Sequence, residues 1–179
     1  MLYLLVGPTG VGKTTLGQAA AAAIPNCKFY ELERLVAVNA RMASASDVMR
    51  VQGPDHYWRL CARILQAVKT RHEKSLSPAL CAVGQCTLES ARARTVLCKY
   101  PNSILIWAPP EEVYRRSGWW PERPFRQFVA YEYGTYPRAV YEEIGRRLRF
   151  DVTGLDKEAA CKGFVEWFRK VLAPPTEKT

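Results

Sequence analysis

The chain has 179 residues, of which 48% are hydrophobic and 24% charged, which predicts one globular domain with one hydrophobic core. No apolar run approaches the roughly 20 residues that cross a bilayer, and the short apolar start lacks the form of a signal peptide, so we expect a cytoplasmic protein with no membrane partner. The formal net charge of +9 favours anionic partners, such as phosphorylated metabolites or nucleic acid.

The six cysteines are spread along the chain and include no CxxC pair. At this chain length such spacing is not typical of a disulfide framework, and the two histidines lie away from any cysteine pair that could hold zinc. We therefore expect free thiols in a reducing compartment, with no structural zinc site.

Predicted strands and helices alternate along the chain. Short apolar runs predict strands over residues 2–6, 27–30, 80–83, 103–108 and 150–153. Helical patterns follow each of them, over residues 14–23, 34–50, 54–72, 89–99, from 110 onward, 136–147 and 157–172. Two prolines make the segment 119–125 irregular, and the polar tail 174–179 is expected to fray.

This alternation predicts an α/β fold, namely a doubly wound, five-stranded parallel sheet with right-handed crossovers. The sequence contains no internal repeat and no linker-like stretch. We therefore expect a single domain over residues 1–173.

A phosphate-binding loop lies between the first predicted strand and the first predicted helix. The segment from Gly7 to Thr14, GPTGVGKT, matches the pattern G-x-x-x-x-G-K-[ST] at every required position. Glycines let successive backbone N–H groups surround an anion, and the helix that follows adds its positive end. The predicted nucleotide-binding residues are Gly7, Pro8, Thr9, Gly10, Val11, Gly12, Lys13, Thr14 and Thr15.

Within this loop, two side chains have separate expected roles. Lys13 supplies positive charge to the β- and γ-phosphates, and the Thr14 hydroxyl is a ligand for Mg²⁺. The chain has no N-K-x-D segment of the kind that reads guanine in Ras-type GTPases, and it is too short for a motor ATPase. The predicted cofactors are therefore ATP and Mg²⁺.

The segment between Val113 and Arg149 contains eight arginines and no lysine. The planar guanidinium binds phosphate oxygens in pairs, so this bias suits a site that clamps phosphates away from water. We expect a lid over about residues 115–128, in which Arg116 and Arg123 neutralise charge on the transferring phosphoryl group. The later arginines at 146, 147 and 149 are interpreted as an ordinary solvated surface.

Several segments together resemble the shikimate kinase branch of the nucleoside monophosphate kinase fold. They are the phosphate loop, FYELE over residues 29–33, GPDHYWR over 53–59, APPEEVYRR over 108–116, RPF over 123–125, YEEI over 141–144 and FDVT over 150–153. The resemblance implies a P-loop kinase with three α/β/α layers, a short lid and acceptor-binding helices over about residues 34–72.

The resemblance also implies roles for residues on the acceptor side. Glu33 would orient the acceptor hydroxyl or accept its proton, while Glu31 would reach Mg²⁺ through water beside Thr14. Arg59 would hold an anionic group of the acceptor. Together with Gly84 and Arg138, these residues are the expected acceptor site: Glu31, Glu33, Arg59, Gly84 and Arg138.

Departures from the family pattern also fall on the acceptor side. The Gly-Gly-Gly run expected after the third strand is here Gly84-Gln85-Cys86, and Arg138 stands one position from the expected arginine. Both acids are glutamates where the family has aspartates. These changes predict ATP-dependent transfer to a small molecule other than shikimate.

Three alternatives remain open at this stage. The acceptor could be a nucleotide, as in nucleoside monophosphate kinases, since several arginines could converge on two sets of phosphates. A basic chain with aromatics among its arginines could instead be an ATP-binding protein associated with nucleic acid. A degenerate kinase that binds nucleotide without turnover is the third. The sequence leaves the acceptor and the oligomeric state undetermined.

Overall fold

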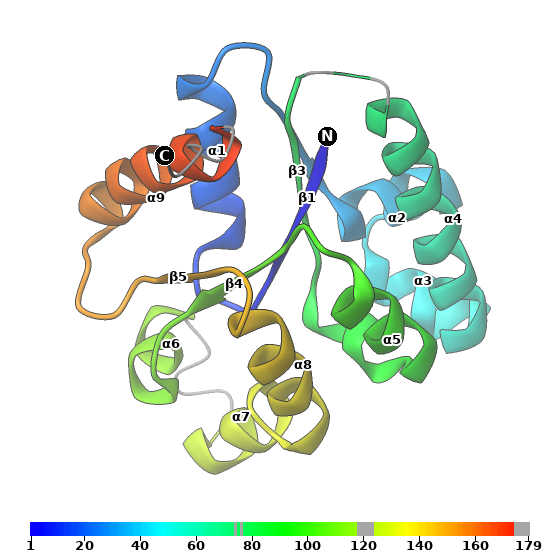
Figure 1. Ribbon diagram of the computed structural model, residues 1–179. Coiled ribbons are helices and arrows are strands. Elements are labelled where there is room, and N and C mark those ends of the chain that lie inside the picture. The colour runs from blue at the N-terminus through cyan, green and yellow to red at the C-terminus, as the bar shows by residue number, and fades with distance from the viewer. Residues whose placement is uncertain (74, 76, 118–123, 174–179) are drawn as a thin grey trace.

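The computed structural model describes every residue except 74, 76, 118–123 and 174–179. Its five strands are β1 (Leu2–Val6), β2 (Lys28–Glu31), β3 (Ala79–Ala82), β4 (Ser103–Trp107) and β5 (Arg149–Asp151). They form one sheet in the order β2-β3-β1-β4-β5, with every neighbouring pair parallel. The predicted doubly wound, five-stranded parallel sheet is confirmed (Figure 1).

Helices cover both faces of this sheet. In chain order they are α1 (Lys13–Ala23), α2 (Leu32–Ala40), α3 (Ala45–Gln52), α4 (Pro54–Glu73), the 3₁₀ helix η1 (Gln85–Glu89), α5 (Ala91–Lys99), α6 (Pro110–Arg116), α7 (Phe125–Glu132), α8 (Thr135–Gly145) and α9 (Lys157–Leu172). None of the described helices is long and apolar enough to cross a membrane.

The central strand β1 separates two hydrophobic cores, because successive side chains of a strand point to opposite faces. Leu2, Leu4 and Val6 belong to the core shared with α2, α3, α4, α5 and α8, whereas Tyr3 and Leu5 belong to the core shared with α1, α6, α7 and α9. All five side chains are buried. The expected three-layer α/β/α arrangement follows from this alternation.

Three local predictions need correction. The helical segment expected over residues 34–50 is two helices, because Arg41 adopts a left-handed conformation (φ 55°) that ends α2 and Ser44 begins α3 by accepting a hydrogen bond from the Asp47 amide, 3.1 Å. Helix α7 and the 3₁₀ helix η1 were not expected. Pro124 precedes α7, where a fixed φ suits a helix start.

The carboxyl ends of parallel strands lie at one edge of the sheet, where α/β proteins bind ligands. The phosphate loop follows β1, Glu31 ends β2 and Gly84 follows β3, and these three strands are neighbours in the sheet. The topology therefore brings the nucleotide-binding and acceptor-binding candidates to the same edge.

Candidate functional site

The backbone of the phosphate loop favours glycine at three positive-φ positions, Gly7, Gly10 and Gly12, and at two of them there is also no room for a side chain. Gly7 and Gly10 have positive φ angles of 153° and 88°. A Cβ at Gly7 would lie 2.3 Å from the Ile106 carbonyl oxygen, and one at Gly10 would lie 2.7 Å from the Cβ of Ser117. The loop is therefore pressed against the end of β4 and the end of α6, and its curvature depends on the absence of side chains.

Lys13 begins α1 and folds back over this loop. Its Nζ donates hydrogen bonds to the carbonyl oxygens of Gly7 and Pro8, at 2.7 and 2.9 Å. Burial lowers the pKa of Lys13, and the carboxylates of Glu33 and Glu132 oppose that shift. The charge of Lys13 is thus held at the centre of the loop, between two acids.

Thr14 and Glu31 meet as the predicted magnesium pair requires. The Thr14 hydroxyl donates to Oε1 of Glu31 at 2.6 Å, from the first turn of α1 to the end of β2. Hydroxyl and carboxylate oxygens are ligands that suit Mg²⁺, which keeps several waters of its own. These donors and the glycine-formed loop fit a magnesium–nucleotide complex.

Glu132 is a buried acid of the nucleotide side that the sequence did not reveal. It is 0% exposed at the end of α7, and its Oε2 accepts a hydrogen bond from the Thr9 amide at 2.8 Å. The two residues stand 123 positions apart, and no local pattern marks a single glutamate in a helix that was not expected. Glu132 joins α7, which begins within the predicted lid, to the phosphate loop.

A cavity of about 380 Å³ lies beside the loop. It is lined by loop and α1 residues on one side and by the turn before α9 on the other: Gly10, Val11, Gly12, Thr15, Leu16, Arg116, Val152, Leu155, Asp156, Lys157 and Ala160. Its size lies within the range of small-molecule pockets. It lies directly beside the predicted phosphate-binding segment, with Gly10, Val11 and Gly12 in its lining.

Arg116 lines this cavity and is anchored to the protein. Its guanidinium donates to the carbonyl oxygens of Val152, at 3.3 Å, and Leu155, at 2.7 Å, and forms an ion pair with Glu112. Its predicted role in phosphoryl transfer stays a prediction. Arg123, the other predicted lid arginine, lies outside the described residues, as does most of the expected lid centre.

On the acceptor side, Glu33 lies directly over Gly84. A Cβ at Gly84 would fall 1.4 Å from Oε1 of Glu33, so the carboxylate occupies the space that any larger residue would need. The Cys86 thiol donates to the same oxygen at 3.7 Å, and the Tyr57 hydroxyl lies 2.9 Å from the Cys86 sulfur. The predicted pair Glu33 and Gly84 is thus brought together, with Cys86 and Tyr57 behind it.

Burial raises the pKa of Glu33, while the positive charge of Lys13 lowers it in part. Burial and the nearby Glu33 carboxylate raise the pKa of Cys86 to about 12, which keeps that thiol protonated and able to donate. A carboxylate with a raised pKa beside the phosphate-loop lysine has the properties of a proton acceptor.

A second cavity, of about 420 Å³, opens above Glu33. Glu31, Glu33 and Arg34 line it together with residues of α2, α3 and the connection between them: Ala37, Val38, Met42, Ala43, Ser44 and Ala45. Arg34 is exposed, and no hydrogen bond or ion pair joins it to the described residues. This arginine was not singled out from the sequence, although it directly follows Glu33.

Arg59 and Arg138 are not joined to this cavity. Arg59 is exposed on α4 and lines a separate cavity between α4 and α5. Arg138 lies on the exposed side of α8, where it donates to Glu142 at 2.8 Å. Their predicted contacts with an acceptor stay predictions, since Glu33 and Gly84 meet without either of them.

Gln85, which stands within the altered glycine run, is committed to the protein. Its amide donates to the Tyr131 carbonyl at 2.9 Å and accepts from the Tyr141 hydroxyl at 2.9 Å. The side chain is buried and fixes η1 to α7 and α8. The segment that contains Gln85 is therefore fixed by side-chain contacts and does not leave an exposed backbone surface for a ligand.

The family model for shikimate kinase matches residues 9–149, which is most of the chain. The chain belongs to the shikimate kinase family. As a family member it is an ATP-dependent kinase that phosphorylates a small molecule, and the family uses ATP and Mg²⁺. The phosphate loop, Lys13 and the Thr14–Glu31 pair fit that chemistry.

Solved structures of kinases share the fold at low sequence identity. Shikimate kinase from Aquifex aeolicus has a TM-score of 0.72 and 16% identity, covering 96% of this chain and 98% of that one. Shikimate kinase from Acinetobacter baumannii, in complex with shikimate, has a TM-score of 0.65 and 18% identity, covering 96% and 92%. A gluconokinase from Sinorhizobium meliloti has a TM-score of 0.55 and 14% identity, covering 96% and 92%. No curated protein sequence matches the chain.

Proposed function

We propose that this kinase transfers the γ-phosphoryl group of ATP to a hydroxyl group of a small anionic acceptor other than shikimate, bound in the cavity above Glu33. The observation that carries the proposal is the half-buried Glu33 carboxylate, which lies over Gly84 in the field of Lys13 and lines an open cavity. A carboxylate with a raised pKa at that place can accept the proton of an attacking hydroxyl.

The nucleotide side supplies charge and position. The backbone of residues 7–14 and the Lys13 ammonium would hold the β- and γ-phosphates, and the cavity at Arg116 would hold the nucleoside. Thr14 and Glu31 would hold Mg²⁺, directly or through water, and the bound ion would neutralise charge on the phosphates. Arg116 and Arg123 are proposed to add positive charge when the lid covers the site.

In the reaction, the acceptor oxygen forms a bond to the γ-phosphorus as the bond from that phosphorus to the β–γ bridging oxygen breaks. ADP leaves, and the hydroxyl proton passes to Glu33. Transfer of this kind depends on position and electrostatics and needs no covalent intermediate with the protein. Arg34 lines the same cavity as Glu33 and is placed to hold an anionic group of the acceptor.

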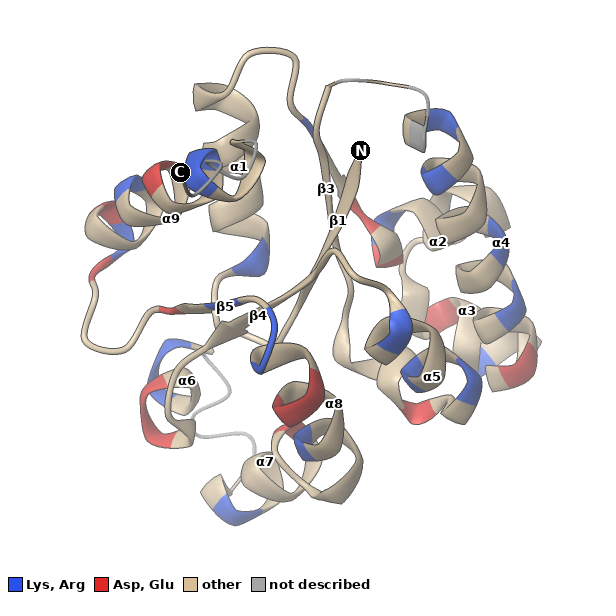
Figure 2. Ribbon diagram, in the orientation of Figure 1, with Lys and Arg blue, Asp and Glu red and all other residues tan. Residues whose placement is uncertain are grey.

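The acceptor wall supports a compound different from shikimate. Gln85 and Cys86 stand where the family has glycines, and both side chains are engaged with protein groups. Neither Arg59 nor Arg138, the two arginines predicted for the acceptor site, lines the cavity above Glu33. The nucleic-acid alternative gains no specific support, because Lys and Arg positions occur on helices over both faces of the sheet (Figure 2).

The test is acceptor-dependent ADP release from MgATP with a panel of compounds. The panel contains hydroxylated carboxylic acids, sugar acids, shikimate and nucleoside monophosphates, and the Lys13→Ala protein is the matched control. We expect a hydroxylated anion other than shikimate to stimulate release, and the Lys13→Ala protein to release ADP about 100- to 1000-fold more slowly. The proposal fails if shikimate is the best acceptor, if only nucleoside monophosphates respond, or if no compound exceeds the control.

A further inference from the structure

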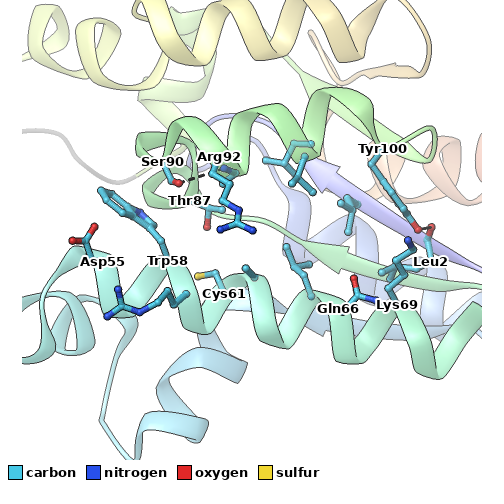
Figure 3. Close-up of a pocket in the computed structure, with 17 residues that line it drawn as sticks. Leu2, Asp55, Trp58, Cys61, Gln66, Lys69, Thr87, Ser90, Arg92 and Tyr100 are labelled. Carbon is cyan, nitrogen blue, oxygen red and sulfur yellow. Dashed lines mark hydrogen bonds between the residues drawn. The ribbon is translucent and has the colours of Figure 1, made fainter.

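A third cavity, of about 620 Å³, lies between α4 and α5 on the other side of Trp58 from Glu33. Figure 3 shows its two long walls, which are α4 below and η1 with α5 above, while β1 lies behind them. Asp55 and Lys69 both line it and stand fourteen positions apart on α4, which corresponds to about 21 Å along the helix axis. The cavity is therefore long and narrow rather than compact.

The floor of this α4–α5 cavity is apolar. Leu2 and Leu4 from β1, Cys61 from α4 and Leu97 from α5 line it, and each is at most 4% exposed. Val96 adds apolar surface that is 52% exposed to solvent. A cavity with such walls favours an apolar ligand, because water finds few hydrogen-bond partners there.

A single buried polar group interrupts the floor near one end. Thr87 is 1% exposed, and its hydroxyl makes no hydrogen bond to a nitrogen or oxygen of the described residues. In Figure 3 the hydroxyl points from η1 toward α4, across the cavity. The Cys61 thiol, which lines the same cavity, is its hydrogen-bond partner. A thiol is a weak partner for a buried hydroxyl, so Thr87 can also meet a polar atom of a ligand.

Two arginines stand at that same end. Arg59 comes from α4 and Arg92 from α5, and Figure 3 shows the Arg92 side chain reaching from α5 toward α4. Neither forms a hydrogen bond or an ion pair with the part of the chain that the structure describes. Asp55 is the one acid among the lining residues, so the charge at this end is net positive.

This cavity is separate from the proposed reaction site. Trp58 closes the end nearer to Glu33 by donating its Nε1–H to the Cys86 carbonyl at 3.3 Å. The residues that line the α4–α5 cavity and those that line the cavity above Glu33 have no member in common. A ligand in the α4–α5 cavity would therefore leave the phosphoryl-transfer site free.

We propose that the α4–α5 cavity is a second ligand-binding site, which takes an alkyl carboxylate of medium chain length. The carboxylate would lie between Arg59 and Arg92 and accept the Thr87 hydroxyl, and the chain would extend past Leu65 and Leu97 toward Tyr100. The length of the groove favours a linear chain over a ring. Charge-assisted hydrogen bonds to guanidinium groups are the contacts that recognise a carboxylate. This proposal does not depend on the identity of the phosphoryl acceptor.

Calorimetric titration of the full chain with decanoate, without nucleotide, tests the proposal. We expect saturable binding, which Arg92→Gln weakens about tenfold and the double change Arg59→Gln with Arg92→Gln weakens about 100-fold, since each arginine contributes a charged hydrogen bond. Decanol, which has the chain without the charge, should bind at least tenfold more weakly. Arg63→Gln, an exposed arginine of α4 outside the cavity, is the matched control and should leave binding unchanged.

The location is tested by Ala93→Phe, which places a ring inside the cavity and should abolish binding of decanoate and decanol alike. A Tm close to that of the wild type shows that this variant is folded. The proposal is overturned if decanoate does not bind up to about 1 mM. It is also overturned if decanol binds as tightly as decanoate and the arginine variants bind decanoate as tightly as the wild type. A dimer in sedimentation whose contact covers α4 and α5 and excludes decanoate would overturn it as well.

Discussion

The nucleotide side and the acceptor side of this kinase are built from different kinds of sequence. The phosphate loop is one continuous segment, and Lys13 donates to two carbonyl oxygens within it. The acceptor side combines residues from three separate segments, namely Glu33 of α2, Tyr57 of α4, and Gly84 with Cys86 at η1. A continuous motif constrains its own geometry, whereas a dispersed site can change one residue at a time. The nucleotide side therefore retains the residues of the family chemistry, and the proposed change of acceptor falls on the acceptor side.

The largest expected effect comes from the nucleotide side. Lys13→Ala removes the ammonium that the loop holds at 2.7 Å from the Gly7 carbonyl, and should lower the rate of phosphoryl transfer about 100- to 1000-fold by removing charge stabilisation. ADP release under saturating ATP measures this. Lys162→Ala, at an exposed position of α9, should leave the rate unchanged. An equal loss of rate in both variants would show that the positive charge at the phosphate loop does not account for the effect of Lys13→Ala.

The second effect separates the two sides. Gly84→Ala places a Cβ where the Glu33 carboxylate lies, so Glu33 must move, and a displacement of about 1 Å can cost up to about 100-fold in rate. We expect kcat to fall while the Kd for MgATP stays unchanged. Gly163→Ala on α9 is the matched control, because its added Cβ meets Phe150 at an ordinary 3.5 Å. A weakened Kd for MgATP in Gly84→Ala would contradict the separation.

A third effect is seen in stability against pH. Burial raises the pKa of Glu33 in the folded state above its value in the unfolded chain, so folding favours the protonated form. Stability from this group is complete below the unfolded pKa and is lost as pH rises through the folded pKa. Glu33→Gln should therefore raise the Tm at neutral pH and flatten its decline between mildly acidic and neutral pH. An unchanged or lowered Tm would show that the ionised Glu33 carboxylate does not destabilise the folded protein at neutral pH.

The smallest effect concerns the helix that borders the acceptor cavity. Ser44→Ala removes the oxygen that accepts the Asp47 amide at the start of α3, and should lower the free energy of unfolding by about 1 kcal/mol. Urea denaturation measures it. Ser46→Ala, at an exposed position in the same helix, should change stability by less than about 0.5 kcal/mol. A similar loss in both would mean that the cap does not hold α3.

The difference between the two sides also decided what could be predicted from the sequence. The five-stranded parallel sheet, the phosphate loop and the meeting of Glu33 with Gly84 follow from local patterns and from the edge where parallel strands end. The contact of Glu132 with Thr9 links segments 123 positions apart, and no local signal marks it. The acceptor role of Arg59, implied by the family resemblance, stays a prediction. Trp58 beside it donates to the Cys86 carbonyl of η1, and Arg59 lines the cavity between α4 and α5.

The break between α2 and α3 shows a similar limit. A helical pattern over residues 34–50 does not reveal that Arg41 adopts a left-handed conformation, because arginine has no preference for it. The Ser44 side chain can cap α3 only after the chain has left the first helix. That turn forms part of the cavity above Glu33. The helical pattern correctly predicted helix on both sides of this turn, but it did not predict the break between α2 and α3. The shape of the cavity above Glu33 depends on that break.

The measurement that tests the central claim most directly is kcat/KM against pH for the wild type and for Glu33→Gln, with the acceptor that the panel yields. The wild type should lose activity on the acid side with an apparent pKa above that of an ordinary glutamate, and Glu33→Gln should be about 100- to 10,000-fold slower and lack that acid limb. Full activity of Glu33→Gln with an unchanged pH profile would contradict the assignment of Glu33 as the residue that meets the acceptor hydroxyl.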